Sequence, residues 1–205
     1  MKKSILLMLF MLLSAYYVQA QKVDLNFVGG YFFRDKVDFG NYYGYIEDAG
    51  AYGVSIEAFV RKNQSAELSY LRQDTHAPLY GYNTGIQYNK DQDKISVNYI
   101  TLGFVNYFTT PNNISPYAGL GIGVGIVSSK DGGGSLTKFA YNAKLGIKIK
   151  TASAVSFKLQ AQLQSIVQGS GSTIYIGTGG AGAGITTYSS VLQFGFLGGI
   201  AINLH

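Results

Sequence analysis

Alternation of apolar and polar residues, with a period of two, is the feature that most constrains the fold of this chain. Between Val155 and Gln164 all the odd-numbered residues are apolar and all the even-numbered residues are polar. Successive side chains of a β-strand point to opposite faces, so this segment predicts a strand with one dry and one wet face.

The same alternation recurs in segments that are longer than the strands of most soluble proteins. We predict eight strands, at residues 22–34, 51–61, 65–74, 95–108, 116–128, 137–149, 154–167 and 187–204. Most of them contain 10 to 14 residues, whereas strands of ordinary globular proteins contain about 5–6. A tilted strand needs about 9–11 residues to cross a bilayer. Strand length therefore favours a membrane-spanning barrel.

The connections between these segments alternate between long and short. The long connections comprise residues 35–50, 75–94, 129–136 and 168–186, and the short ones residues 62–64, 109–115 and 150–153. Outer-membrane barrels combine short periplasmic turns with longer external loops. The sequence therefore predicts an all-β fold, an eight-stranded antiparallel up-and-down transmembrane β-barrel with long external loops and short periplasmic turns.

The residue types on the two faces predict that the apolar face points outward. In segment 116–128 glycines alternate with aliphatic residues, and in segment 137–149 Asn142, Lys144 and Lys148 alternate with apolar residues. Unpaired lysine and amide groups are costly in a dry core, whereas they suit the hydrated lumen of a small barrel. A soluble β-protein is the alternative, but it would carry more surface charge than this chain, of which only 13% is charged.

Residues 1–20 have the order of a secretory signal peptide. Lys2 and Lys3 precede an apolar run from Ile5 to Leu13, and small residues follow up to Ala20. That run is too short for a transmembrane helix, which needs about 20 apolar residues. We therefore predict a cleaved signal peptide at residues 1–20, one barrel domain at residues 21–205, and a location in the outer membrane of a Gram-negative bacterium.

The charge of the mature chain gives no indication of a nucleic-acid partner. Removing Lys2 and Lys3 leaves 14 of the 16 basic residues against 11 acidic ones. This balance is too mild to indicate nucleic-acid binding.

Three features together indicate a family resemblance. They are the signal sequence, the segment Ser115–Gly123, which reads SPYAGLGIG, and the alternating last strand. In these features the mature chain resembles the small outer-membrane β-barrel superfamily, which includes OmpX-like and OmpA transmembrane-domain-like proteins. The resemblance implies an integral, porin-like barrel in contact with outer-membrane lipid and lipopolysaccharide.

Acidic and basic residues are segregated along the chain, since no acidic residue follows Asp131. In an eight-stranded barrel the second and third strands lie opposite the sixth and seventh. We therefore predict that Glu57 and Glu67 pair with Lys148 and Lys158 across the lumen, where neither charge is stable alone. Separate hydration of the lysines by internal water is the alternative. The predicted lumen charge network, which would plug the barrel, comprises Glu57, Arg61, Glu67, Lys144, Lys148 and Lys158.

The first two external loops are rich in tyrosine, glycine and asparagine. This composition is typical of recognition loops, because tyrosine provides contact area at a low entropy cost. The alternative is tyrosine anchored at the membrane interface. The predicted recognition residues are Tyr42, Tyr43, Tyr45, Tyr80, Tyr82 and Tyr88.

Motifs for catalysis and cofactor binding are weak in this chain. Gly177–Gly182 matches G-x-G-x-x-G, but no acidic residue follows it, so we interpret it as a flexible glycine-rich loop and not as a dinucleotide site. His76 with Asp74 and a hydroxyl such as Thr75 or Thr84 would be the only candidate acid–base set, and the chain has no cysteine. We predict no catalytic residue, cofactor or metal site. Five acidic residues of the loops could serve as calcium ligands, but we interpret them as solvated loop charge: Asp35, Asp38, Asp91, Asp93 and Asp131.

The sequence thus predicts a non-enzymatic outer-membrane barrel with a filled polar lumen and a structural or surface-interaction role. It would bind protein partners through its external loops or serve as a subunit of an envelope or secretion assembly. A narrow channel or small-molecule transport barrel is the first alternative, and a rim-located lipid-modifying enzyme is the second.

Overall fold

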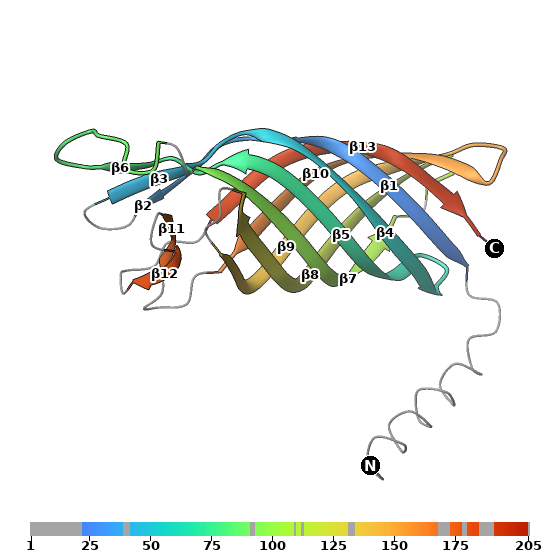
Figure 1. Ribbon diagram of the computed structural model, residues 1–205. Coiled ribbons are helices and arrows are strands. Elements are labelled where there is room, and N and C mark those ends of the chain that lie inside the picture. Colours follow the sequence, from blue (N-terminus) through green and yellow to red (C-terminus); the bar gives the residue numbers. More distant parts are fainter. Residues whose placement is uncertain are drawn as a thin grey trace, which may run out of the picture.

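Eight long strands close into an antiparallel barrel in the computed structural model (Figure 1). The structure describes residues 22–38, 42–90, 93–108, 110–111, 113–130, 134–167, 173–177, 180–184 and 191–204. The barrel order is β1-β13-β10-β9-β8-β7-β5-β4, and β1 also pairs with β4. These strands are β1 (Val23–Phe32), β4 (Ala49–Arg61), β5 (Gln64–His76), β7 (Lys94–Tyr107), β8 (Ile114–Ser129), β9 (Ser135–Lys150), β10 (Val155–Ile166) and β13 (Val191–Asn203). The predicted fold class is confirmed, whereas the predicted signal peptide lies outside the described residues.

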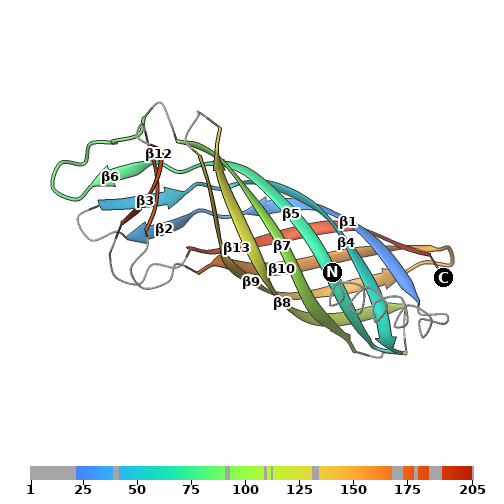
Figure 2. The same cartoon turned by 60° about the horizontal axis from the view of Figure 1, so that its bottom comes forward.

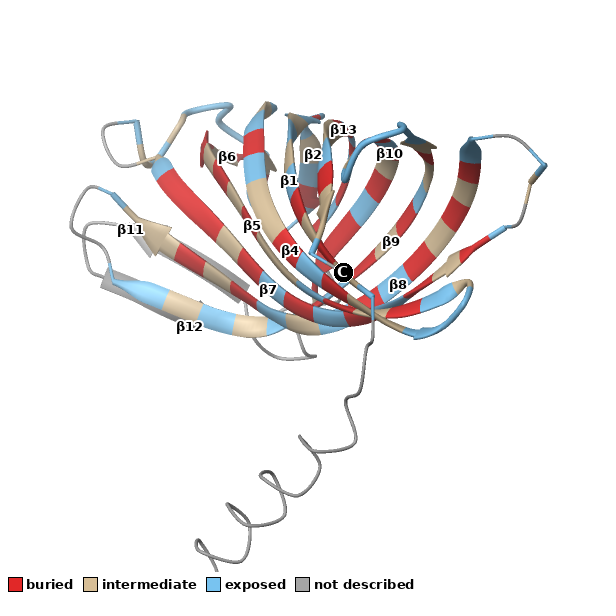
Figure 3. Ribbon diagram, turned by 90° about the vertical axis from the view of Figure 1, so that its right-hand side faces the viewer, coloured by how far each residue is buried: buried red, intermediate tan, exposed pale blue. Residues whose placement is uncertain are grey.

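Burial alternates along every barrel strand, with the apolar face outward (Figure 3). On β7, Phe104 is 71% exposed, whereas Val105 beside it is 1% exposed. Lysine, glutamate and glutamine side chains are buried inside the barrel, which is the reverse of a soluble β-barrel. An outer wall of this kind is compatible with lipid and not with water. Among the described residues, no helix is long and apolar enough to span a membrane.

The long connections, which were predicted as external loops, contain short strands of their own. β2 (Asp35–Asp38), β3 (Tyr42–Ile46) and β6 (Leu79–Gly81) form a three-stranded sheet at one end of the barrel (Figures 1 and 2). β11 (Thr173–Gly177) pairs with β12 (Gly180–Gly184) in the segment predicted as a flexible glycine-rich loop. The pairing of β3 with β6 joins two different connections, so no local pattern could reveal it.

The barrel interior is divided into an apolar half and a polar half. At the long-loop end an apolar cluster fills the lumen, and Phe32, Leu71, Val97, Tyr99 and Ile166 belong to it. The charged side chains lie toward the other end, above a small aromatic cluster. The polar lumen expected from the sequence therefore contains an apolar cluster in the long-loop half. Polar side chains are buried beside that cluster, among them Gln73, Gln164 and Gln193. Both amide atoms of Gln73 lack a hydrogen-bond partner among the described residues, which carries a desolvation cost.

Glycines on the inner face make room for larger inward side chains. A Cβ atom on Gly119 would lie 3.0 Å from the Lys144 side chain, and one on Gly121 would lie 3.0 Å from Asn142. Gly146 is paired directly with Tyr117, whose ring covers it. The inward-facing glycines of segment 116–128 therefore reflect close packing inside a narrow barrel.

We expect Gly146→Ala to lower the free energy of unfolding by about 1–3 kcal/mol, the usual cost of overpacking. The new Cβ would lie 2.6 Å from Cζ of Tyr117 and 2.4 Å from the Leu159 carbonyl oxygen. Urea-induced unfolding in lipid vesicles measures the change. Gly29→Ala is the matched control, because a Cβ there faces outward and meets nothing closer than 3.8 Å. Equal effects of the two substitutions would contradict the packing argument.

Candidate functional site

Three lysine–carboxylate pairs lie inside the barrel. Lys158 pairs with Glu57, Lys144 with Glu67, and Lys148 with a residue that sequence reasoning missed, Asp24. All six side chains are at most 6% exposed. A buried charge without a partner is strongly destabilising. The three lysines can stay charged because each one has its own carboxylate.

The strand register explains why these pairs must reach across the lumen. Asp24 is the direct neighbour of Glu57 on the adjacent strand, and Glu57 is in turn the direct neighbour of Glu67. On the opposite wall Lys158 lies directly beside Lys148. Like charges at directly paired positions repel each other. The row of acids would therefore be unfavourable without the lysines, and the row of lysines would be unfavourable without the acids.

Glu57 is the centre of the network. Its carboxylate accepts hydrogen bonds from the Tyr107 hydroxyl at 2.6 Å, the Asn26 amide at 3.0 Å and the Ser65 hydroxyl at 3.1 Å. Together with the Lys158 ammonium these donors occupy both carboxylate oxygens. Charge-assisted hydrogen bonds of this kind are about twice as strong as neutral ones.

The structure brings five of the six predicted network residues together and leaves Arg61 out. A β-bulge between Phe59 and Arg61 shifts the register at the end of β4, and Arg61 is exposed. Strict alternation had assigned it to the inner face, which a bulge invalidates. Asp24 belongs to the network instead, and its alternation with Leu25 in the first strand was the signal that could have identified it.

Amide side chains continue the polar interior above the ion pairs. Tyr117 donates a hydrogen bond to Gln160 at 2.7 Å, Gln160 donates to Gln162 at 2.8 Å, and Gln162 contacts Gln164 at 3.4 Å. A cavity beside them measures about 20 Å³, enough for about one water molecule. This half of the lumen is therefore packed, and the apolar cluster closes the other half.

Four of the predicted recognition tyrosines form one cluster on the sheet of β2, β3 and β6. The ring centre of Tyr43 lies 5.4 Å from that of Tyr80, 5.0 Å from Tyr82 and 5.8 Å from Tyr45. Tyr42 instead contacts Tyr88, with ring centres 5.4 Å apart. Because neighbouring residues of a strand point to opposite faces, Tyr42 and Tyr43 lie on different sides of the sheet.

Two cations lie over the tyrosine cluster. The Lys36 ammonium is 5.1 Å from the ring centre of Tyr43 and 5.3 Å from that of Tyr82, and the Arg34 guanidinium is 4.5 Å from that of Tyr45. These distances are within the range of cation–π attraction. The sheet therefore presents a fixed arrangement of flat rings and positive charge.

A hydrogen-bonded triad links this cluster to an acid. The Tyr82 hydroxyl donates to Asp38, and the Lys36 ammonium lies 3.2 Å from the same hydroxyl and 3.0 Å from the Asp38 carboxylate. The hydrogen bond from Tyr82, together with that from Lys36, lowers the pKa of Asp38. Hydrogen bonds with Tyr82 and Asp38 raise the pKa of Lys36. Asp38 therefore stays charged further into the acidic range, and Lys36 further into the basic range, than the free side chains do.

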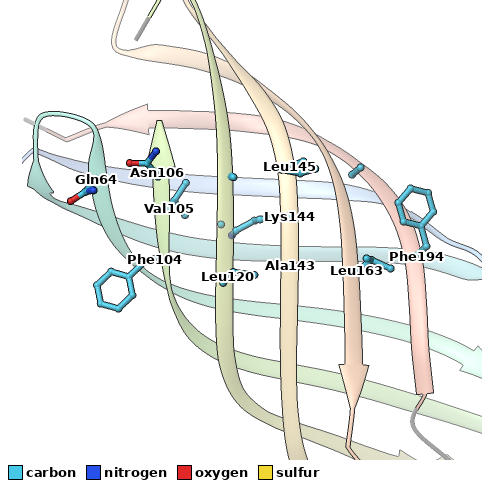
Figure 4. A pocket seen from close by; sticks show the side chains of 13 residues that line it. Gln64, Phe104, Val105, Asn106, Leu120, Ala143, Lys144, Leu145, Leu163 and Phe194 are labelled. Carbon is cyan, nitrogen blue, oxygen red and sulfur yellow. The ribbon is translucent and has the colours of Figure 1, made fainter. Parts of the chain in front are cut away.

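The outer wall carries an apolar depression of about 740 Å³ across β5, β7, β8, β9, β10 and β13 (Figure 4). The small outward residues Ala118, Ala143 and Ala161 line it between bulky ones such as Phe104 and Leu145. Its lining is almost wholly apolar. Such a depression suits an acyl chain of the surrounding bilayer and does not reach through the packed lumen.

The candidate acid–base residues are not arranged as expected. Asp74 pairs with Arg72 and Lys130, so it does not partner His76. The His76 ring nitrogen Nδ1 lies 3.1 Å from Asp93 instead. Thr75 donates its hydroxyl hydrogen bond to a backbone carbonyl. Within the described part of the chain, no hydroxyl is hydrogen-bonded to His76.

The described residues also contain no group of three His, Asp or Glu side chains that could hold a metal ion. Two of the five loop acids considered as calcium ligands, Asp91 and Asp131, lie outside the described residues.

The barrel has the same fold as small outer-membrane proteins of known structure. Neisserial surface protein A (NspA) matches with a TM-score of 0.60 and 12% sequence identity, over 90% of this chain and 98% of its own. The outer membrane protein OprG from Pseudomonas aeruginosa also gives a TM-score of 0.60, with 11% identity, over 91% of this chain and 97% of its own. No protein-family model and no curated protein sequence matches the chain. At these identities the likeness shows the fold, which confirms the predicted resemblance at that level and, with the apolar outer wall, supports the predicted outer-membrane location.

We expect Glu57→Gln to lower the free energy of unfolding by about 3–5 kcal/mol, because it leaves the buried Lys158 ammonium without its carboxylate. Adding Lys158→Met in the same chain should recover part of the loss, which a double-mutant cycle from urea unfolding measures. The exposed Arg61→Gln is the control and should change stability by less than about 0.5 kcal/mol. Additive effects of the two buried substitutions would show that the pair is not coupled.

Proposed function

We propose that the protein is an integral outer-membrane barrel that acts at the cell surface through the sheet of β2, β3 and β6. The observation that carries this proposal is the cluster of Tyr43, Tyr45, Tyr80 and Tyr82 under two cations. The closed barrel below it serves as the membrane anchor. Its partner is a macromolecule outside the cell or a neighbouring component of the envelope.

The rigidity of this sheet supports a recognition role. The tyrosines lie on paired strands and an adjoining turn, so their backbone is ordered before a partner arrives. Pre-ordered aromatic side chains lose little entropy on binding. Tyr82 is 48% exposed, which leaves ring surface free for contact although its hydroxyl is hydrogen-bonded. Tyrosine in a membrane-interface belt would face lipid on the barrel wall, whereas these residues lie on the sheet beyond it.

The two alternative functions have less support. A channel needs a continuous path, but the apolar cluster and the ion pairs fill successive levels of the lumen. A rim enzyme needs a nucleophile beside His76, and the described residues place no hydroxyl there. The surface-interaction role uses the features that the structure does present.

We expect the purified protein to give no discrete conductance steps in planar lipid bilayers. The reason is that the Phe32, Leu71 and Ile166 side chains pack together inside the barrel. A triple variant with alanine at these positions is the comparison, and it should show measurable conductance if the barrel still forms. Stable open channels in the unaltered protein would contradict the anchor role and favour transport.

We expect a photo-reactive amino acid at Tyr82 to form covalent adducts with a partner in intact cells. The double change Tyr43→Ser with Tyr80→Ser should reduce adduct formation at least about tenfold, because loss of two aromatic contacts removes most of a small interface's binding energy. Tyr42→Ser with Tyr88→Ser is the matched control on the other face. Adducts that are insensitive to the first pair, or equally sensitive to the second, would overturn the proposed binding face.

A further inference from the structure

The short-turn end of the barrel opens into a pocket of about 590 Å³, which we call the basic vestibule. Four exposed cations line it: Lys22 before β1, Arg61 at the end of β4, Lys62 in the following turn and Lys150 at the end of β9. These residues come from opposite walls of the barrel, so the vestibule lies across the mouth of the lumen. No carboxylate contributes to its lining among the described residues.

Among the described residues, the four cations of the vestibule lack the acidic partners that the lysines of the lumen have. Inside the lumen each lysine has its own carboxylate, and Lys130 at the far end has Asp74. In the part of the chain that the structure describes, none of the four vestibule cations lies within 4.0 Å of a carboxylate. The vestibule therefore carries an uncompensated positive charge, which attracts anions.

An aromatic pair forms the floor of the vestibule. The rings of Phe59 and Tyr107 are stacked with centres 5.6 Å apart. The Lys148 ammonium lies 5.8 Å from both ring centres, and the Lys22 ammonium lies 5.4 Å from Phe59. Lys148 also lines the pocket while pairing with Asp24. An apolar floor lowers the local dielectric constant and strengthens the attraction between the surrounding cations and an anion.

We propose that the basic vestibule binds a phosphate-bearing anion that approaches from the short-turn side, which faces the periplasm in barrels of this fold. Four converging cations suit a multiply charged group, because a single carboxylate would leave most of them uncompensated. Phosphate supplies more than one charge and three acceptor oxygens, and Arg61 matches its geometry with a planar fork of donors. The volume exceeds what inorganic phosphate fills, so the cations have room for a second phosphate, and the aromatic floor suits an organic portion of the ligand. Free phosphate compounds and phospholipid headgroups share this chemistry.

The test is calorimetric titration of the full mature chain in a neutral detergent. Pyrophosphate is the soluble probe, and short-chain phosphatidylglycerol in the same micelles is the lipid probe, with phosphatidylcholine as the lipid of zero net charge. We expect saturable binding with one site per chain, and weakening as sodium chloride rises because ions screen exposed charges. Saturation by pyrophosphate assigns the site to a soluble ligand, and saturation by phosphatidylglycerol alone assigns it to a lipid headgroup.

Arg61→Gln and Lys62→Gln should each weaken binding about tenfold, the loss of one charge-assisted hydrogen bond. The matched controls are Lys130→Gln and Lys94→Gln, which each remove one positive charge at the opposite end of the barrel and should leave affinity unchanged. Heat-modifiable gel migration shows whether each variant is folded. Absence of one-site binding to both probes, or equal weakening by the controls, would overturn the proposal and would leave the proposed surface role untouched.

Discussion

A bilayer offers no hydrogen-bond partners to the backbone, so every strand must pair with another strand on both sides. The rest of the structure depends on this requirement. The first strand pairs with both β4 and the last strand β13, so no sheet edge is left open to lipid. Closure gives the chain two surfaces with opposite requirements. The outer one must be apolar over its full height, and the inner one must satisfy its own polar groups within a narrow space.

The polarity of the inner surface changes along the barrel axis. Toward the long loops it contains an apolar cluster with buried polar side chains such as Gln73, Gln164 and Gln193 beside it. Toward the short turns it contains three carboxylates and three lysines that are paired one to one. Replacing such pairs by well-packed apolar residues is often neutral or stabilising. In this half Glu57 accepts hydrogen bonds from four strands besides its own, β1, β5, β7 and β10, so the pairs hold these strands in one specific arrangement.

The two ends of the barrel are chemically distinct because different residues of the connections and strand ends are exposed there. At the long-loop end the connections pair into a sheet that presents tyrosine rings and cations with acidic partners. At the short-turn end the cations have no acidic partners in the described chain, and they surround an aromatic floor. A filled barrel of this kind separates the two ends, so each surface can act on its own side of the membrane.

Period-two alternation by itself determined the number of barrel strands and the outward direction of the apolar face, because these depend only on which residues face lipid. It also identified Glu57, Glu67 and three lysines, since charge is rare on a strand that crosses a membrane. Only the tertiary structure decided which charges meet. Lys148 joins Asp24 over 124 positions in sequence, and the bulge at Phe59 turns Arg61 out of the lumen. Likewise β3 and β6 pair between separate connections. Register, bulges and pairing across the lumen arise from contacts between distant segments, and a local pattern contains no information about those contacts.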